Sequence, residues 1–356
     1  MNAGGISVRG IGIIGAPGTG VDAVWRSLNG GGTPETDGVV FREKELPFTV
    51  DLPASKLRRV NRYSRLALAA SLEAQKDAGL TIDAAAPFRY GVVFTTGYGS
   101  LVSNIGFTKA AARDEPDLCS PTLFAGTVAN ACVGQVCMQL NLKGPGTVLT
   151  GGNAFLYSKL LIETGGADVM FAGAVEEYCA DLFDALGKNE ISAGVQLSEG
   201  AAAFILERAD EGSCCLIGES VSVGLEAWPL IGKFDPPGAE DAVKHAIRRC
   251  IERGGKADVV VGSANGSWFD GVEARAFAEE LPDAFVLPGV KDCFGETLGS
   301  AFSMNVAVAA MCLRYGALPS VPARGASYDG PLRKILVTGC DPIGNYHCME
   351  LKSSKK

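Results

Sequence analysis

The stretch Ile6–Gly15, ISVRGIGIIG, decides how the fold is interpreted. Its apolar residues are nearly continuous, which is typical of a strand buried on both faces of a sheet. Gly10, Gly12 and Gly15 also fit the G-x-G-x-x-G pattern of dinucleotide-binding turns. A dinucleotide site needs these glycines in the turn after the strand, where the backbone approaches the pyrophosphate. Because they lie among isoleucines inside the strand, the sequence predicts a buried strand and argues against a dinucleotide cofactor.

Strand-like and helix-like stretches alternate outward from this segment, which predicts largely parallel sheets covered by helices. Two similar halves, residues 1–210 and 211–356, would then form a layered α/β/α/β/α sandwich. The expected strands are Ile6–Gly15, Tyr90–Thr95, Thr147–Thr150, Val169–Ala174, Ala201–Glu207, Cys215–Val223, Val259–Gly262, Phe285–Leu287 and Lys334–Thr338. The expected helices are Ser64–Ala78, Asn130–Leu140, Ala154–Thr164, Ala239–Gly254, Val272–Glu280 and Leu298–Tyr315.

Composition excludes several classes of protein. The 356 residues are 47% hydrophobic, enough for a large core, and carry a formal net charge of −8. Negative charge argues against a nucleic-acid partner, because phosphates are neutralised by clustered Lys and Arg. The start of the chain lacks the features of a secretion signal, and no apolar run reaches the roughly 18–20 residues of a membrane span. We therefore expect a cytoplasmic protein with no membrane span.

The eleven cysteines predict reduced thiols. Their number is odd, and the nearest pairs, Cys132/Cys137 and Cys214–Cys215, have neither zinc-site nor redox-motif spacing. In a large chain without a secretion signal, such cysteines mostly serve as small apolar core residues. We expect neither a bound metal nor a cofactor.

Five segments in chain order resemble the β-ketoacyl synthases of the thiolase superfamily. The resemblance implies a thiolase-like five-layer α/β/α/β/α sandwich of two similar halves. The segments are VRGIGIIGAPGTGVDAVWRSLNGG (8–31), RVNRYSRLALAASLEAQKDAGL (59–80), TVANACVGQVCMQLNLKGPG (127–146), GGADVMFAGAVEE (165–177) and SEGAAAFILER (198–208).

The first catalytic part of a β-ketoacyl synthase is a thiolate that accepts the acyl group. Such a thiolate sits at a helix N-terminus, where the helix dipole and backbone N–H groups lower its pKa and form an oxyanion hole. The resemblance places this position at Asn153, after the turn Gly144-Pro145-Gly146 and the segment TVLTGG. An amide is not a nucleophile at neutral pH, so we expect no acyl-enzyme there.

The other two catalytic parts are imidazoles that assist decarboxylation and stabilise the enolate. The segment ANGS (264–267) resembles the family's HGT motif, with Asn265 in place of the first histidine. KDCFGETLGSA (291–301) resembles the second motif: Lys291 is kept, and Glu296 stands in place of the second histidine. His245 and His347 match neither motif. We expect His245 to be exposed on a polar helix, and the approach of His347 to the old pocket is left open.

Loss of all three groups resembles the chain-length factors of type II polyketide and aryl polyene systems. This resemblance implies a non-condensing subunit that pairs with an active ketosynthase, shapes its acyl tunnel and meets an acyl carrier protein. No catalytic residue is expected, and Asn153, Asn265, Glu296 and Lys291 are vestigial positions. The alternatives are a β-ketoacyl synthase or malonyl decarboxylase with a non-standard active site, and a scaffold that does not touch the acyl chain.

Individual residues in and around the vestigial site are given specific hypotheses. Asn153 is expected to make structural hydrogen bonds, and Lys291 and Glu296 to form a buried ion pair. The resemblance implies a dimer interface at Ser120–Leu140 and Thr147–Thr150. The residues proposed to set tunnel length there are Phe107, Phe124 and Met138. The residues proposed to dock the acidic carrier protein, from one helical face, are Arg58, Arg62 and Arg65.

Overall fold

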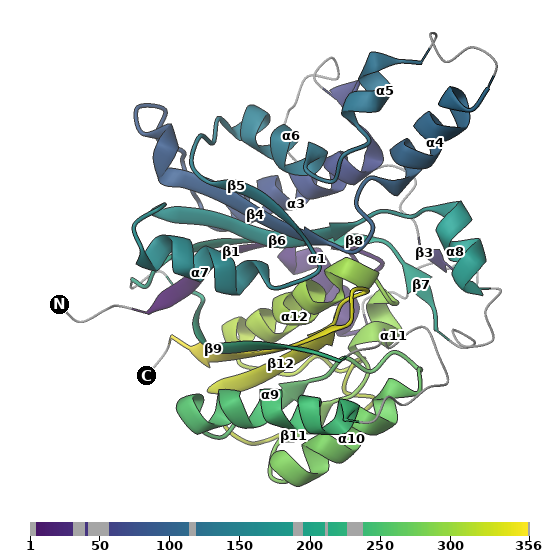
Figure 1. The fold of residues 1–356 in the computed structure, drawn as a ribbon. Helices are drawn as coiled ribbons and strands as arrows, with labels where there is room; N and C mark the ends of the chain where they lie inside the picture. Colours follow the sequence, from purple (N-terminus) through teal and green to yellow (C-terminus); the bar gives the residue numbers. More distant parts are fainter. Residues whose placement is uncertain are drawn as a thin grey trace.

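The structure is a computed structural model that describes residues 5–30, 40–41, 57–113, 119–187, 195–210, 213–225 and 238–354. Within these residues, eleven strands form one sheet, and two short strands, β3 (Val40–Phe41) and β7 (Leu197–Ser198), pair separately. Ten of these eleven strands form two groups of five, which Figure 1 shows stacked one above the other. The eleventh, β2 (Gly18–Thr19), pairs with the end of the first strand. The two groups join where the first residues of one strand in each group pair antiparallel, Ile6–Val8 with Cys215–Ile217.

Both groups of strands follow the same order. The first strand of each group in the chain lies at one end, next to the fifth, and the third lies at the other end. The first group has the order β1-β8-β6-β4-β5, from β1 (Ile6–Gly15), β4 (Tyr90–Thr96), β5 (Gly146–Thr150), β6 (Val169–Glu176) and β8 (Gly200–Arg208). The second has the order β9-β13-β12-β10-β11, from β9 (Cys215–Gly224), β10 (Val259–Val261), β11 (Phe285–Leu287), β12 (Lys334–Cys340) and β13 (Asn345–Ser353).

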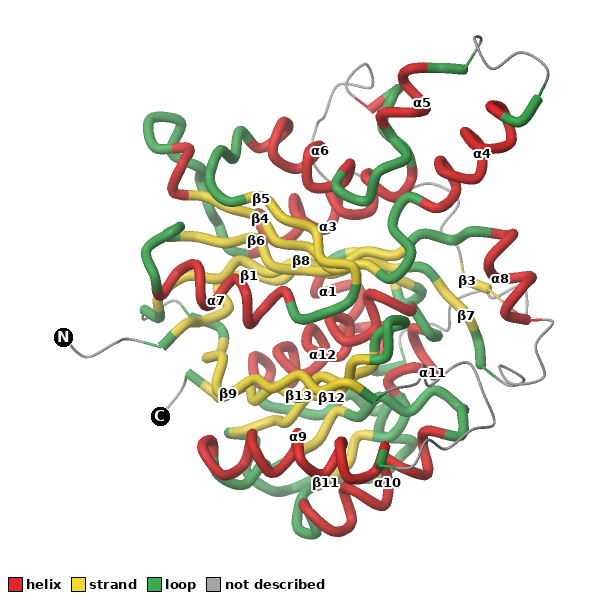
Figure 2. The backbone as a smooth tube through the Cα atoms, in the orientation of Figure 1, coloured by secondary structure: helices red, strands yellow, loops and turns green. Residues whose placement is uncertain are grey.

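Helices form the three remaining layers, and Figure 2 shows them alternating with the strands. The outer face of the first group is covered by α3 (Arg62–Asp77) and α6 (Ala131–Leu140), and that of the second by α9 (Ala239–Gly254) and α10 (Phe269–Glu280). Between the two groups lie α1 (Val21–Leu28), α7 (Ala154–Glu163) and α12 (Ala301–Tyr315). The shorter elements are β2 (Gly18–Thr19), α4 (Leu101–Ala111), α5 (Pro121–Ala125), α8 (Ala180–Gly187) and α11 (Val290–Phe294), with single turns at Pro87–Arg89 and Leu298–Ser300.

Three of the four apolar clusters of the described residues lie between these five layers. The largest lies between the two strand groups and contains nearly all of α12, which is buried on every face except its last turn. A helix that is apolar all round is stable only when it is enclosed. The next two lie between each strand group and its outer helices, and the fourth, small cluster includes Phe183, Leu186 and Leu298. The five-layer sandwich expected from the sequence is therefore confirmed. The expectation of largely parallel sheets is wrong, because β1, β8, β9 and β13 pair antiparallel with their neighbours.

The glycines of β1 have a packing role. A Cβ atom at Gly12 would lie 1.9 Å from the carbonyl oxygen of Ala70, and one at Gly10 would lie 2.5 Å from that of Ala74. Both carbonyls belong to α3, so the glycines let this helix pack directly on the strand. They are inside β1, as the sequence predicts, and do not form a phosphate-binding turn.

All nine predicted strands and all six predicted helices are present, with ends shifted by up to three residues. Strand β13 was not predicted, nor were α4, α5, α8 and α11. The proposed boundary after residue 210 falls between β8 and β9 and stays a prediction. In the described part of the chain, no helix has the length and apolar character to cross a membrane, and no cluster of side chains is suited to hold a metal ion.

Candidate functional site

Asn153 stands at the sharp turn between β5 and α7. Gly151 and Gly152 make the turn with φ of 71° and 101°, a conformation that side chains with a Cβ rarely adopt. The Asn153 side chain accepts a hydrogen bond from the backbone N–H of Leu156 at 3.1 Å and so caps α7. Its amide nitrogen donates to Oγ of Ser220 on β9 at 2.9 Å. The amide therefore fastens the helix start to the second strand group, and the expectation of structural hydrogen bonds is confirmed.

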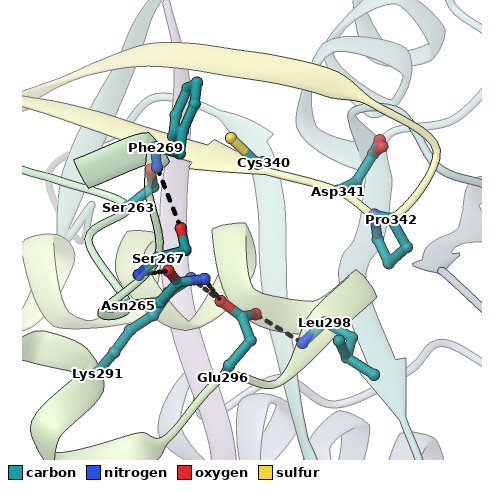
Figure 3. Close-up of a pocket in the computed structure, with 10 residues that line it drawn as sticks. All are labelled: Ser263, Asn265, Ser267, Phe269, Lys291, Glu296, Leu298, Cys340, Asp341 and Pro342. Carbon is teal, nitrogen blue, oxygen red and sulfur yellow. Dashed lines mark hydrogen bonds and ion pairs between the residues drawn. The ribbon is translucent and has the colours of Figure 1, made fainter. Parts of the chain in front are cut away.

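Asn265 and Lys291 meet at the carboxylate of Glu296, as Figure 3 shows. The amide nitrogen of Asn265 donates to Oε2 of Glu296 at 2.8 Å, and the ammonium of Lys291 forms an ion pair with the same oxygen. The side chains of Lys291 and Glu296 are 8% and 4% exposed. The predicted buried ion pair is confirmed, and its charges are neutralised inside the protein.

Backbone groups hold this cluster rigid. Glu296 Oε1 accepts the N–H of Leu298 at 2.8 Å, and Asn265 Oδ1 accepts the N–H of Ser267 at 3.0 Å. The N–H of Asn265 donates to Asp270 at the start of α10, at 3.0 Å. Both oxygens of the Glu296 carboxylate thus accept hydrogen bonds from groups of the protein itself.

The cavity beside this cluster is small. Its volume is about 10 Å³, which is room for roughly one water molecule. An acyl or malonyl group does not fit into such a space in this conformation. Its lining residues are Ser263, Asn265, Ser267, Phe269, Lys291, Glu296, Leu298, Cys340, Asp341 and Pro342.

Asp341, in the turn between β12 and β13, connects the cavity to the helix start at Asn153. Its Oδ2 accepts the N–H of Gly152 at 2.7 Å, and it pairs with Nε2 of His347 at 3.1 Å. Burial raises the pKa of Asp341, but hydrogen bonds from His347, Asn345 and Gly152 outweigh burial and hold it well below its usual range. His347 is therefore a neighbour of the old pocket, which the sequence left open. His245 is exposed on α9, as expected.

Two other buried carboxylates lie near the site, and neither was predicted from the sequence as a site residue. Glu176 accepts the backbone N–H groups of Gly97, Tyr98 and Gly299, and burial raises its pKa to about 7 despite these bonds. Glu273 accepts from Thr338 and Tyr346 and is fully buried, which raises its pKa. Glu176 lies in the segment 165–177 quoted above, whereas Glu273 lies six residues beyond ANGS (264–267), and the sequence does not show that either carboxylate is buried.

The thiols on α6 do not form a replacement nucleophile. Cys132 is fully buried, and burial raises its pKa to about 12. Burial also raises the pKa of Cys137, which packs toward β5. A nucleophilic cysteine needs a lowered pKa, so the core role expected for both residues agrees with their surroundings.

The proposed tunnel residues lie on a surface formed by α4, α5 and α6. The rings of Phe107 and Phe124 pack in a tilted arrangement with centroids 5.2 Å apart, while Phe124 and Met138 are 58% and 66% exposed. Strand β5 lies at the edge of the sheet, with β4 as its one partner among the described strands. Other exposed apolar side chains are Val102 on α4, Val128 before α6, and Leu156, Tyr157 and Leu160 on α7.

The three arginines proposed for carrier docking do not lie on one helical face. Arg58 is exposed in a turn before α3, which begins at Arg62. Arg62 is bound to the buried carboxylate of Glu199, with Nε 2.8 Å from Oε2. Arg65 donates to the backbone carbonyls of Leu57 and Val60. A groove of about 370 Å³ opens nearby, between α5, α6 and the start of α3.

Comparison with known proteins agrees with the fold. Nodulation protein E of Rhizobium sp. (strain N33) is 24% identical over 88% of this chain and 87% of its own length. The tetracenomycin polyketide synthase ketoacyl synthase alpha subunit of Streptomyces glaucescens is 26% identical, over 92% of this chain and 88% of its own. The solved structure of the ishigamide ketosynthase/chain length factor aligns with a TM-score of 0.80 at 18% identity, covering 99% of both chains.

A family match lies in the first half of the chain. Residues 40–212 match the model of the β-ketoacyl synthase N-terminal domain, and they contain Asn153 and most of the first strand group. The relatives above cover both halves. The chain is thus similar in sequence to β-ketoacyl synthases, and it has the thiolase fold of the solved ketosynthase structures.

Proposed function

We propose that this chain is a non-condensing subunit of the chain-length-factor type. The observation that carries the proposal is the state of the three positions where the family has its catalytic groups. Asn153 caps a helix, and Asn265 and Glu296 are bonded to each other and to Lys291. No thiolate or imidazole stands at these positions, and the cavity beside Asn265 and Glu296 has room for about one water molecule.

The partner proposed for the chain is an active ketosynthase that retains a cysteine and two histidines. The surface formed by β5, α4, α5, α6 and α7 supports this proposal, because it exposes a sheet edge together with large apolar side chains. An open edge and a contiguous apolar surface mark a protein interface. A ketosynthase/chain length factor is also among the structures with the same fold.

Co-expression with such a ketosynthase tests the proposal. We expect the two chains to co-purify as a heterodimer that converts a malonyl-loaded carrier protein into a β-ketoacyl product. This chain alone should give no product, because it lacks the nucleophile that accepts the growing chain. Condensation by this chain alone, or failure to associate with any ketosynthase encoded beside it, contradicts the proposal.

The pair Phe107 and Phe124 is proposed to limit the acyl tunnel that the two subunits share. Their tilted rings pack against each other between α4 and α5. Replacing either with Ala removes most of an aromatic side chain, so we predict that Phe124→Ala shifts the heterodimer's products to longer chains. Product lengths are measured by mass spectrometry, with Phe88→Ala as the control because Phe88 is exposed at the opposite end of β4 from α4. An unchanged product spectrum excludes a role in chain length.

The carrier protein is proposed to dock near Arg58 and Arg59, beside the groove at the start of α3. Both side chains are exposed, whereas Arg62 and Arg65 are occupied by internal partners. A solved ketosynthase of the same fold is in complex with its acyl-carrier protein. Arg58→Glu should weaken binding of an acidic carrier protein and reduce the loss of affinity with added salt, because an attractive charge is removed. Unchanged affinity excludes this docking site.

A further inference from the structure

A serine, a histidine and an aspartate form a hydrogen-bonded chain beside the old catalytic position. Oγ of Ser222 on β9 lies 2.8 Å from Nδ1 of His347 on β13, and Nε2 of His347 lies 3.1 Å from Oδ2 of Asp341. The two strands pair antiparallel, with Ser222 directly opposite His347. A serine, a base and an orienting carboxylate within hydrogen-bond reach are the parts of an activated nucleophile.

The surroundings fix the roles of the three groups. Asp341 receives the N–H groups of Ile343 and Asn345 on Oδ1 and that of Gly152 on Oδ2. Its pKa is held well below its usual range, because these bonds and His347 outweigh the effect of burial. An ionised Asp341 requires a proton on Nε2 of His347, which leaves Nδ1 as an acceptor for the Ser222 hydroxyl. In the well-known serine hydrolases Nε2 faces the serine and Nδ1 faces the aspartate, whereas here Nδ1 faces Ser222 and Nε2 faces Asp341. Either ring nitrogen can serve as the base.

The three hydrogen-bonded residues differ in their exposure to solvent. A catalytic base is best shielded from water, whereas a nucleophile must be reached by the substrate. His347 and Asp341 are 1% and 5% exposed, and the ring of Phe302 packs on the imidazole with centroids 5.2 Å apart. Ser222, in contrast, is exposed. The base and its orienting group are therefore shielded from water, while the residue that carries the hydroxyl is exposed.

The location ties this chain of residues to the vestigial site. Ser220, two residues before Ser222, lies on the same face of β9 and accepts the hydrogen bond from Asn153. Asp341 lines the small cavity and binds Gly152. The exposed hydroxyl thus lies on the strand face that meets the start of α7, where a condensing enzyme would carry its thiolate.

We propose that Ser222 is an acyl-accepting nucleophile, with His347 as its general base and Asp341 as the residue that orients the imidazole. Oγ of Ser222 attacks the carbonyl carbon of an acyl thioester, and its proton moves to Nδ1 of His347. The C–S bond breaks, and the thiolate leaves with that proton as a free thiol. The acyl group remains as an ester on Ser222, which a water molecule, deprotonated by His347, hydrolyses to the free acid. This activity releases acyl groups without forming a carbon–carbon bond.

A fluorophosphonate probe tests the nucleophile without reference to any substrate. The probe phosphonylates an activated serine with loss of fluoride, and peptide mass spectrometry locates the modified residue. We expect labelling at Ser222 in the whole chain, complete loss in Ser222→Ala, and at least a tenfold slower rate in His347→Gln and Asp341→Asn. Ser320→Ala, which removes another exposed serine hydroxyl, should label at the normal rate. An unlabelled Ser222 in the folded chain overturns the proposal.

A second measurement separates activation from a structural role. Ser222→Cys keeps a nucleophile opposite His347, so it should still take an acetyl group from an acetyl-N-acetylcysteamine thioester, seen as an added acetyl mass. Ser222→Ala should not, and circular dichroism should show both variants folded. Labelling of Ser222 that is unchanged by His347→Gln also contradicts the proposal.

The choice of a thioester rests on the proposed function, whereas the fluorophosphonate reaction does not. Labelling at Ser222 without heterodimer formation would contradict only the chain-length-factor proposal. Heterodimer formation with an unreactive Ser222 would contradict only this inference.

Discussion

At the scale of single residues, the main feature of the proposed vestigial site is a buried ion pair. Lys291 and Glu296 are both almost completely buried, and each neutralises the other. Taking a charge out of water costs several kcal/mol per ion, so each of these buried charges is tolerated only when its partner is present. Asn265 and the N–H of Leu298 complete the hydrogen bonds of the carboxylate. The position that the resemblance assigns to a catalytic histidine is therefore part of the structural core.

Removing one partner of this pair should destabilise the protein strongly. In Glu296→Gln the ammonium of Lys291 is left buried without a countercharge, so we predict a loss of about 3–5 kcal/mol in the free energy of unfolding. Urea unfolding measures it. The matched control is Asp181→Asn, which breaks the exposed pair of Lys109 and Asp181 and should change stability by less than about 1 kcal/mol. Equal effects of the two changes would show that Glu296 is not effectively buried.

At the scale of elements, the contact between β1 and α3 depends on the absence of side chains. Gly12→Ala places a Cβ 1.9 Å from the carbonyl oxygen of Ala70, so either the helix or the strand must move. We predict a loss of about 3 kcal/mol or more, since overpacked cores lose 1–3 kcal/mol even when the neighbours are side chains. Gly5→Ala, where nothing lies within 4 Å, is the control and should leave the melting temperature unchanged. A melting temperature equal to that of the control contradicts direct packing of α3 on β1.

The elements around the open edge of β5 should carry the partner interface. Leu160 on α7 is 51% exposed, and a lysine there is compatible with the helix because it lies near its C-terminal end. If the partner covers this surface, Leu160→Lys loses apolar burial and buries a charge, so affinity for the ketosynthase should fall at least about tenfold. Val286→Lys, on the opposite edge strand β11, should leave affinity unchanged. Analytical ultracentrifugation or surface plasmon resonance measures both, and an equal response of the two variants contradicts this interface.

At the scale of the whole molecule, buried carboxylates make stability depend on pH. Burial raises the pKa of Glu176 and Glu177 from 4.5 to about 7, against the hydrogen bonds that lower it. The folded protein therefore binds these protons more tightly than the unfolded chain does. The stabilisation is complete below pH 4.5 and is lost as the pH rises to about 7, at up to roughly 1.4 kcal/mol per carboxyl and pH unit.

We predict that the protein is more stable at pH 4.5 than at pH 6, by on the order of 1–2 kcal/mol for each of these two groups. Thermal unfolding at constant ionic strength measures the difference. Cys214 acts in the opposite direction, because its hydrogen bond to Cys215 and the Arg314 guanidinium lower its pKa to about 6, so its contribution is avoided by measuring below pH 6. Glu177→Gln should reduce the slope of stability against pH, while the slope that remains comes from the other buried carboxyls. A slope that it leaves unchanged contradicts a titrating Glu177.

Local patterns were sufficient for most elements of the fold. Buried strands such as β1 and β6 are continuous apolar runs, and α9 has a clear apolar face, so their ends are visible in the sequence. Strand β13 was missed because NYHCMELKS mixes apolar and charged residues. Glu350 is buried in it only because Lys334 and Lys352 pair with its carboxylate. Helix α4 was missed because its apolar residues do not form one face and only Ser103 is buried.

The sequence by itself determined the layered fold, because periodicity and motif spacing are local properties, and it predicted the three positions where catalytic groups are replaced. The buried pairing of Lys291 with Glu296 followed from their spacing and type. Only the tertiary structure decided that the cavity beside them is small. It also decided that Asp341 joins His347 to Gly152, and that Ser222 stands opposite that histidine. These contacts form between strands that are far apart in the chain, so their distances depend on sheet register and packing, which no local pattern encodes.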